Sequence, residues 1–250
     1  MIREMKRASF LLVAVSIACS FSFVYGQQTR DAILVDTMGE LGCDDLQARL
    51  DLFADDVYTT PGAVGFAVIY PGENPFVNAA YERGIKFNSA FRGFPAHLVQ
   101  PVWGPFEPTL KIEMWKITGS TSPPVRDSPP DYRLPAISRR TRFVEDDVEV
   151  FKIDGKLHYV GTGECVNTFS LEVLSKVLSA NPRLTAEIVI FNRSRRKARI
   201  VTRLIRDEAL SINKITADRL KIIYGGSGIA KEWSADGSAI ELWLLPTKAK

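Results

Sequence analysis

Hydrophobic positions repeat along this chain in a pattern that predicts the same unit twice. In the first copy, apolar residues recur every three or four positions, which predicts one buried face of an amphipathic helix. These residues are Leu46, Leu50, Phe53 and Val57. A continuous apolar run over residues 65–70 follows, and a run of that length is typical of a buried strand.

The second copy follows the same plan. A similar stretch begins at Cys165 and leads to an apolar run over 186–191, and the two copies close on related segments. Residues 111–117 read Lys-Ile-Glu-Met-Trp-Lys-Ile, and residues 239–245 read Ala-Ile-Glu-Leu-Trp-Leu-Leu. A period of about 122 residues is too long for a solenoid repeat. We therefore expect an α+β protein with two tandem β-α-β-α-β-β sandwich domains, each with helices on one face of a small mixed sheet.

Turn residues and apolar periodicity define the remaining elements. Asp154-Gly155 stands between alternating runs and predicts a hairpin of strands 148–153 and 156–160, because both central residues of a type I′ turn need positive φ. The second of these strands leads into Cys165 as 33–36 leads into Cys43. Further helices are expected over 78–92, over 169–179 and from Ser194, and further strands over 98–103, 188–191 and 220–224.

The first residues have the features of a targeting segment. Arg3, Lys6 and Arg7 precede an apolar stretch, and Val24-Tyr-Gly26 predicts cleavage before Gln27. Two alternatives stay open: a lipid anchor at Cys19, although Ser16 stands where a larger apolar residue is expected, and retention of the uncleaved segment. The expected location is exported, either periplasmic or secreted.

These patterns give the expected domain organisation, which is a signal peptide at 1–26, a first repeat at 27–118, a linker at 119–147 and a second repeat at 148–246. Five prolines between 119 and 135 are typical of an extended linker. Removal of residues 1–26 lowers the formal net charge from +3 to +1, because three cations and one anion are lost. A nearly neutral chain gives no reason to expect a polyanion partner from overall charge.

Two cysteines remain after cleavage, Cys43 and Cys165, at the same point of each copy. An oxidising compartment makes a disulfide between them possible; the alternative is that each thiol packs at the start of its helix. Without a third cysteine or a Cys-x-x-Cys motif, we expect no metal site and no cofactor.

The second copy resembles the OmpA-like, peptidoglycan-associated domain family. Lys197-Ala198 with Val201 and Ile205 is similar to that family's Arg-Ala-x-x-Val-x-x-x-Leu helix. The segment 215–220 with Tyr224-Gly-Gly-Ser is similar to its passage from helix to strand, and Ile240-Glu-Leu to its last strand. The resemblance covers roughly 157–245 and, more faintly, 33–117.

This resemblance implies a fold of the expected kind and peptidoglycan as a candidate partner. The family holds diaminopimelate with an Asp after the central strand and with the helix Arg. Here the loop Asn192-Arg-Ser194 contains no Asp, and Lys197 stands at the Arg position. A lysine cannot reproduce the bidentate contact of an arginine with a carboxylate.

A basic cluster is the other candidate for a binding site. Residues 193–206 contain seven cations and no acid. They are Arg193, Arg195, Arg196, Lys197, Arg199, Arg203 and Arg206. Such a cluster at a helix N-terminus suits phosphate or carboxylate groups; the alternative is a solvated face, paired in part with Asp207, Glu208 and the acidic segment 44–56.

Catalytic residues are not evident. His97 and His158 are the two histidines, and both stand in expected strands without ligand spacing. The leading hypothesis is a non-catalytic exported envelope protein that binds peptidoglycan, an anionic envelope polymer or another envelope protein. Nucleic acid is not an expected partner. The alternative hypothesis is a secreted enzyme with its site between the two modules.

Overall fold

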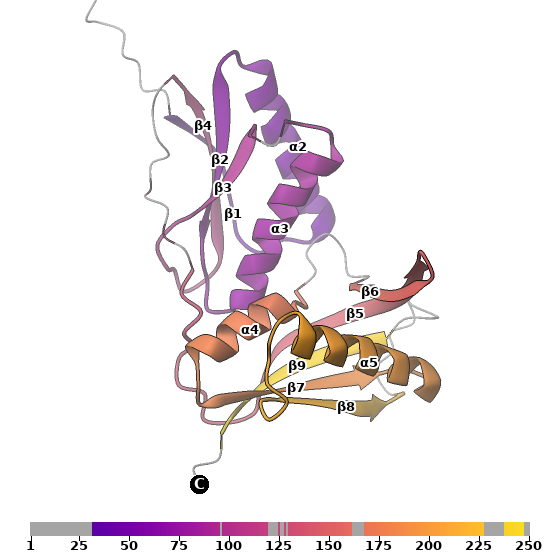
Figure 1. The fold of residues 1–250 in the computed structure, drawn as a ribbon. Coiled ribbons are helices and arrows are strands. Elements are labelled where there is room, and N and C mark those ends of the chain that lie inside the picture. Colours follow the sequence, from indigo (N-terminus) through magenta and orange to yellow (C-terminus); the bar gives the residue numbers. More distant parts are fainter. Residues whose placement is uncertain are drawn as a thin grey trace, which may run out of the picture.

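A computed structural model describes residues 32–95, 97–119, 125, 128, 130–161, 168–227 and 238–247. The expected signal peptide and Cys19 lie outside the described residues, as does Cys165. The described chain forms two α/β modules joined by the segment after β4 (Figure 1). No helix in this part of the chain is long and apolar enough to cross a membrane.

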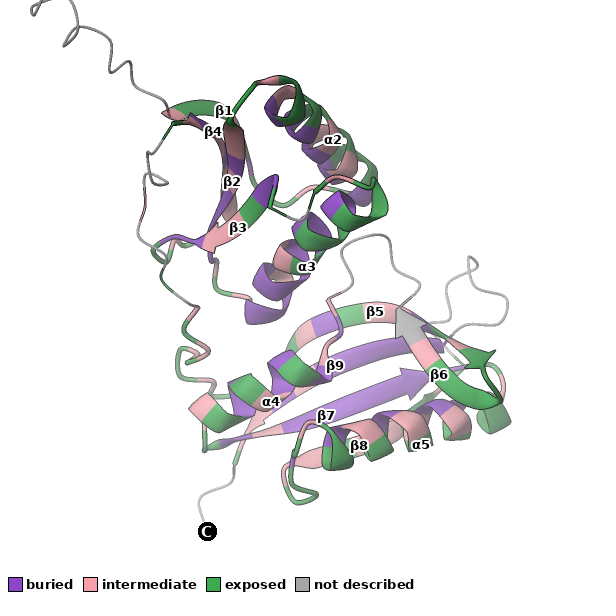
Figure 2. Ribbon diagram, turned by 45° about the horizontal axis from the view of Figure 1, so that its top comes forward, coloured by how far each residue is buried: buried purple, intermediate pink, exposed green. Residues whose placement is uncertain are grey.

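The first module contains four strands and two helices. In chain order these are β1 (Ala32–Met38), α2 (Cys43–Thr59), β2 (Ala63–Tyr70), α3 (Pro75–Phe91), β3 (Val99–Trp103) and β4 (Lys111–Thr118). The strand order is β1-β4-β2-β3; β2 and β3 are parallel, and the other two pairs are antiparallel. Both helices lie on one face of the sheet (Figure 2).

The second module contains the same elements and one additional strand. These are β5 (Thr141–Ile153), β6 (Lys156–Gly161), α4 (Leu171–Ala180), β7 (Leu184–Phe191), α5 (Arg195–Ser211), β8 (Leu220–Gly226) and β9 (Ser238–Pro246). The strand order is β6-β5-β9-β7-β8, and only β7 and β8 are parallel. The α+β fold with two small mixed sheets is therefore confirmed.

Strand register relates the two modules residue by residue. In the parallel pairs, Gly65 is opposite Val99 and Ala186 is opposite Leu220. The pairing of β1 with β4 shifts register directly after Leu34–Trp115, and the pairing of β5 with β9 shifts directly after Arg142–Trp243. A bulge at the same place in each module is difficult to explain by chance, because bulges are specific features of a fold. The structural similarity of the two modules thus extends to a local irregularity of the sheet.

The hairpin was placed wrongly in this comparison. We expected the strand after Asp154-Gly155 to correspond to β1, but β5 takes that position because it pairs with the closing strand β9. Strand β5 also begins at Thr141, so residues 141–147, expected in the linker, belong to the sheet. Strand β6 is an addition at the sheet edge. Positive φ at Asp154 and Gly155 agrees with the predicted turn.

Helices α3 and α5 have equivalent beginnings and equal lengths. Asn74 caps α3 by accepting from the Phe76 N–H, and Ser194 caps α5 by accepting from the Lys197 N–H. On α5 the buried residues recur every three or four positions, as the sequence predicts. They are Ala198, Val201, Ile205 and Ala209.

The two modules share part of one hydrophobic core. Phe76 and Ala79, from the start of α3, belong to the core cluster of the second module, and Phe76 is fully buried there. The Asn74 side chain donates to the Phe143 carbonyl of β5 at 2.9 Å, and α3 contacts α4 (Figure 1). The flank of α3 that carries Phe76 therefore docks the first module onto the second.

Candidate functional site

The basic cluster lies on and just before α5. All seven cations have exposed side chains. Within the described residues, six of them form no ion pair and no side-chain hydrogen bond, the exception being Lys197. The alternative pairing of the cluster with Asp207, Glu208 and the acidic helix 44–56 is absent among the described residues; Asp51 and Asp56 of that helix pair with Arg92 and Lys116. The structure thus leaves strong positive charge uncompensated at this surface.

Helical geometry places five of these cations on one flank. At about 100° per residue, they fall within an arc of about 100°, centred roughly 125° from the buried stripe. They are Arg195, Arg196, Arg199, Arg203 and Arg206, and we call them the arginine stripe. Eleven residues separate its ends, which corresponds to a length of about 16 Å.

Lys197 and Arg193 are not part of this stripe. Lys197 lies on the opposite flank of α5, where it lines a cavity of about 460 Å³ with Val148 and Val150 of β5. Arg193 precedes the helix. Of the residues proposed from the sequence as one binding site, the structure therefore brings together Arg195, Arg196, Arg199 and Arg203 and separates the other two.

The first module uses the equivalent flank as a docking surface. Aligning α3 and α5 at their N-caps places Arg196 at the position of Phe76 and Arg199 at that of Ala79. Both α3 residues are buried against the second module. Arg203 corresponds to Arg83, whose pKa burial lowers, although nearby Glu172 of α4 opposes that shift. The flank that makes the internal contact in α3 is exposed and cationic in α5.

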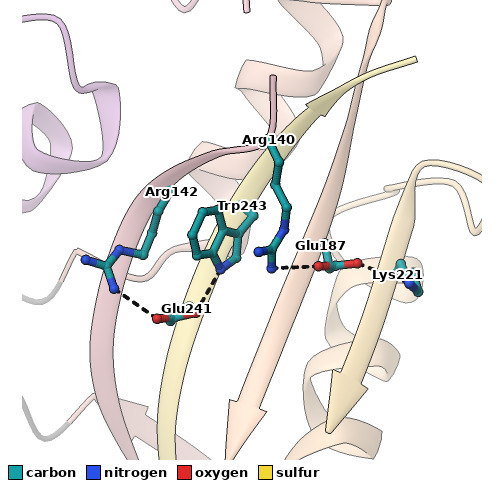
Figure 3. Close-up of polar contacts among 6 residues, drawn as sticks. All are labelled: Arg140, Arg142, Glu187, Lys221, Glu241 and Trp243. Atoms are coloured by element: carbon teal, nitrogen blue, oxygen red, sulfur yellow. Dashed lines mark hydrogen bonds and ion pairs between the residues drawn. The ribbon is translucent and has the colours of Figure 1, made fainter. Parts of the chain in front are cut away.

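Cations on the outer face of the second sheet are paired, in contrast to those of α5. Glu241 accepts from Arg142 at 2.9 Å and from the Trp243 indole N–H at 2.9 Å (Figure 3). Glu187 binds Arg140 at 2.8 Å and Lys221 at 3.1 Å. The two carboxylates are buried, and the Arg140 guanidinium lies 3.7 Å from the Trp243 ring centroid. Arg142 also pairs with Glu145 at 2.8 Å, so three carboxylates compensate the three cations of this network.

The first module repeats the glutamate–tryptophan pair of this network. The Trp115 indole N–H donates to Glu113 at 3.0 Å, and the Tyr70 hydroxyl donates to the same carboxylate at 2.8 Å. Burial and the contact with Glu113 raise the pKa of Tyr70 to about 12. Burial favours the neutral form of Glu113, but hydrogen bonds from Tyr70, Trp115 and Lys111 outweigh it and lower the pKa of that carboxyl. The two tryptophans therefore have a structural role.

Asn192 is a positioning residue that the sequence analysis missed. Its side chain is buried between β7 and α5, where it donates to the Ser238 hydroxyl at 2.9 Å and accepts from the Ser194 N–H at 2.6 Å. The Tyr224 hydroxyl donates to its carbonyl at 3.0 Å. These contacts fix the start of α5 relative to the sheet. An Asn two residues before a Ser N-cap is the signal that could have identified it.

The histidines do not form a site with the cavity between the first module and the linker. His97 is exposed in the turn before β3, and His158 is exposed on β6, where it stacks on Phe151. That cavity, of about 290 Å³, lies at the ends of β2 and β3 beside the linker. Its carboxylates are Glu73 and Asp131, and Asp131 pairs with Arg133 at 2.5 Å. Among the described residues, no group of His, Cys, Asp or Glu could hold a metal ion.

Cys43 occupies the first position of α2, is buried and forms a disulfide. Its expected partner, Cys165, lies outside the described residues, so the pairing of these two cysteines stays a prediction. A disulfide at Cys43 argues against the alternative in which this residue packs as a free thiol.

Comparison with known proteins adds no identification. No protein-family model matches the chain, and no curated protein matches it.

Proposed function

We propose that this chain is a non-catalytic exported binding protein, and that the arginine stripe of α5 binds an anionic partner. The observation that carries the proposal is that the two modules use equivalent helix flanks differently. In α3 this flank is buried in an interface, whereas in α5 it carries five exposed arginines without an ion pair among the described residues. An exposed flank of uncompensated charge is complementary to an anionic surface.

The resemblance to OmpA-like domains makes peptidoglycan one candidate partner within this proposal. We do not propose that this chain recognises peptidoglycan through the positions that the family uses. Asn192 stands after the central strand and its side chain is already used by Ser194 and Ser238. Lys197 faces the cavity beside β5. Recognition through the arginine stripe uses neither residue.

Binding to defined anionic probes tests the proposal. The mature chain is added to immobilised polyglutamate, to polyphosphate and to isolated peptidoglycan sacculi over a salt series. A variant with Arg195, Arg196 and Arg199 replaced by Ser removes three positions of the stripe. The matched control replaces Lys152, Lys156 and Arg139, three exposed cations elsewhere in the second module, so that the net charge changes equally.

The stripe variant should bind at least one probe more weakly than the control variant, by about threefold or more, because exposed ion pairs are each worth about 0.2–1 kcal/mol. Binding by the parent should fall as salt rises, since exposed charges are screened. Equal binding by the two variants on all three probes would show that the stripe is only a solvated surface.

A further inference from the structure

Strand β8 has an outer edge that is open as far as the described residues show. It is the last strand of its sheet, and in the described part of the chain no strand pairs with its outer side. Alternate residues of a parallel strand direct their backbone groups to the same neighbour. Because the Ala186 N–H donates to the Arg219 carbonyl at 2.8 Å, the backbone groups of Leu220, Ile222 and Tyr224 face outward.

The first module closes the equivalent edge. Strand register places Pro101 of β3 at the position of Ile222, since Ala67 is opposite Pro101 and Ile188 is opposite Ile222. A proline has no N–H and protects an edge strand against pairing. In addition, the Ser128 N–H donates to the outward carbonyl of Trp103 at 2.8 Å. The β3 edge is blocked, whereas no described residue blocks the β8 edge.

The arginine stripe faces the side of α5 on which this open edge lies. The hairpin of β5 and β6 lies along one flank of α5, where Lys197 and Ile200 line the cavity beside β5. Strand β8 is at the other end of the strand order, and Figure 1 shows it on the other side of the helix. The stripe therefore runs along the open edge. A seven-residue strand extends over about 23 Å, which spans the stripe of about 16 Å.

We propose that β8 binds an extended acidic polypeptide segment as an added strand, with the carboxylates of that segment paired to the arginine stripe. Strand addition supplies backbone hydrogen bonds, and side-chain contacts supply specificity. The edge selects a polypeptide over a lipid, a glycan or a phosphate polymer, because only a polypeptide offers alternating N–H and C=O groups at strand spacing. This inference rests on the proposed function, since it uses the same arginines.

A proline at position 222 tests the strand addition. Ile222→Pro copies Pro101, so the fold accommodates a proline here, and it removes an N–H that does not bond to β7. Ile222→Ala is the matched control, since it shortens the same side chain and keeps that N–H. The probes are a short peptide of alternating glutamate and valine, and polyphosphate as an anion without a peptide backbone. Circular dichroism verifies that both variants are folded.

Ile222→Pro should bind the peptide at least about tenfold more weakly than Ile222→Ala, because a backbone hydrogen bond is lost and the added strand is pushed away. Polyphosphate binding should be equal in the two variants. Equal peptide binding by the two variants would overturn the added strand while leaving the proposed function intact. If the variant with Arg195, Arg196 and Arg199 replaced by Ser binds every probe as well as its control variant does, the proposed function itself is overturned.

Two alternately N-methylated forms of the peptide provide a second measurement on the parent protein. One form carries its methyl groups on the edge that faces β8, and the other carries them on the opposite edge. Only the first should lose binding, since both have the same charge. Equal binding by the two forms would mean that charge alone holds the peptide and that no strand is added.

Discussion

Arg199 lies at the centre of the arginine stripe, so its replacement should stabilise the protein while weakening its binding. Arg195, Arg196 and Arg203 are each three or four positions from Arg199 on α5, and like charges at this spacing destabilise a helix by about 0.2–0.5 kcal/mol per pair. Arg199→Gln removes three such pairs. Arginine and glutamine have similar helix propensities, and the Arg199 side chain is exposed. The free energy of unfolding should therefore rise by about 0.6–1.5 kcal/mol.

Urea unfolding of the parent and of Arg199→Gln, at low salt and in roughly 1 M salt, measures this difference. Since the Debye length falls to about 3 Å in 1 M salt, the gain should shrink there. Arg199→Glu should stabilise further, because repulsive pairs become attractive pairs. This prediction would be refuted if the variant is less stable than the parent, or if its gain in unfolding free energy does not change with salt. Either result would mean that repulsion among the arginines of the stripe does not destabilise α5.

Three further predictions concern the scaffold. Phe76→Ala should cost about 3–5 kcal/mol and loosen the contact between modules, which denaturant unfolding and small-angle scattering would detect; a change confined to the first module would contradict the shared core. Peptide mapping of the unreduced protein should find Cys43 linked to Cys165, and a link to any other residue would refute that pairing. Because the folded pKa of Tyr70, about 12, exceeds its ordinary value of 10.0, its contribution to stability is present below pH 10 and is lost as pH rises toward 12. Tyr70→Phe should remove this part of the alkaline destabilisation, and an unchanged pH profile would contradict it.

The elements of the fold were predictable where periodicity was clear. The helix from Ser194 follows from its cap and from the spacing of Ala198, Val201 and Ile205, and all three residues are buried. The interior strands β2 and β7 follow from their continuous apolar runs. Strand β5 was expected to begin late, because Thr141–Asp147 contains four charged residues. Its bulge and its pairing with β9 place charges such as Arg142 on the outer face, and these are properties of the sheet rather than of the segment.

The candidate site was predicted in part. A run of cations is visible in the sequence, but its division into a stripe and two separate residues depends on the rotation of α5 about its axis. The contrast between Pro101 and Ile222 could not be recognised without strand register, because the segments around them are not similar in sequence. The docking role of the α3 flank likewise depends on how the two modules pack together.

The charge distribution along α5 is unfavourable for an isolated helix, which argues that it serves binding. A helix is stabilised by acids near its N-terminus and cations near its C-terminus. Helix α2 follows this rule with Asp44 and Asp45 in its first turn, whereas α5 begins with Arg195-Arg-Lys and has Asp207-Glu208 near its end. Two lysines on other helices do have an acid four positions away, as in Lys86 with Glu82 and Lys176 with Glu172. A helix selected only for solubility would show such pairs. On α5 the N-terminal dipole instead adds to the field of the stripe, which raises its attraction for an anionic partner.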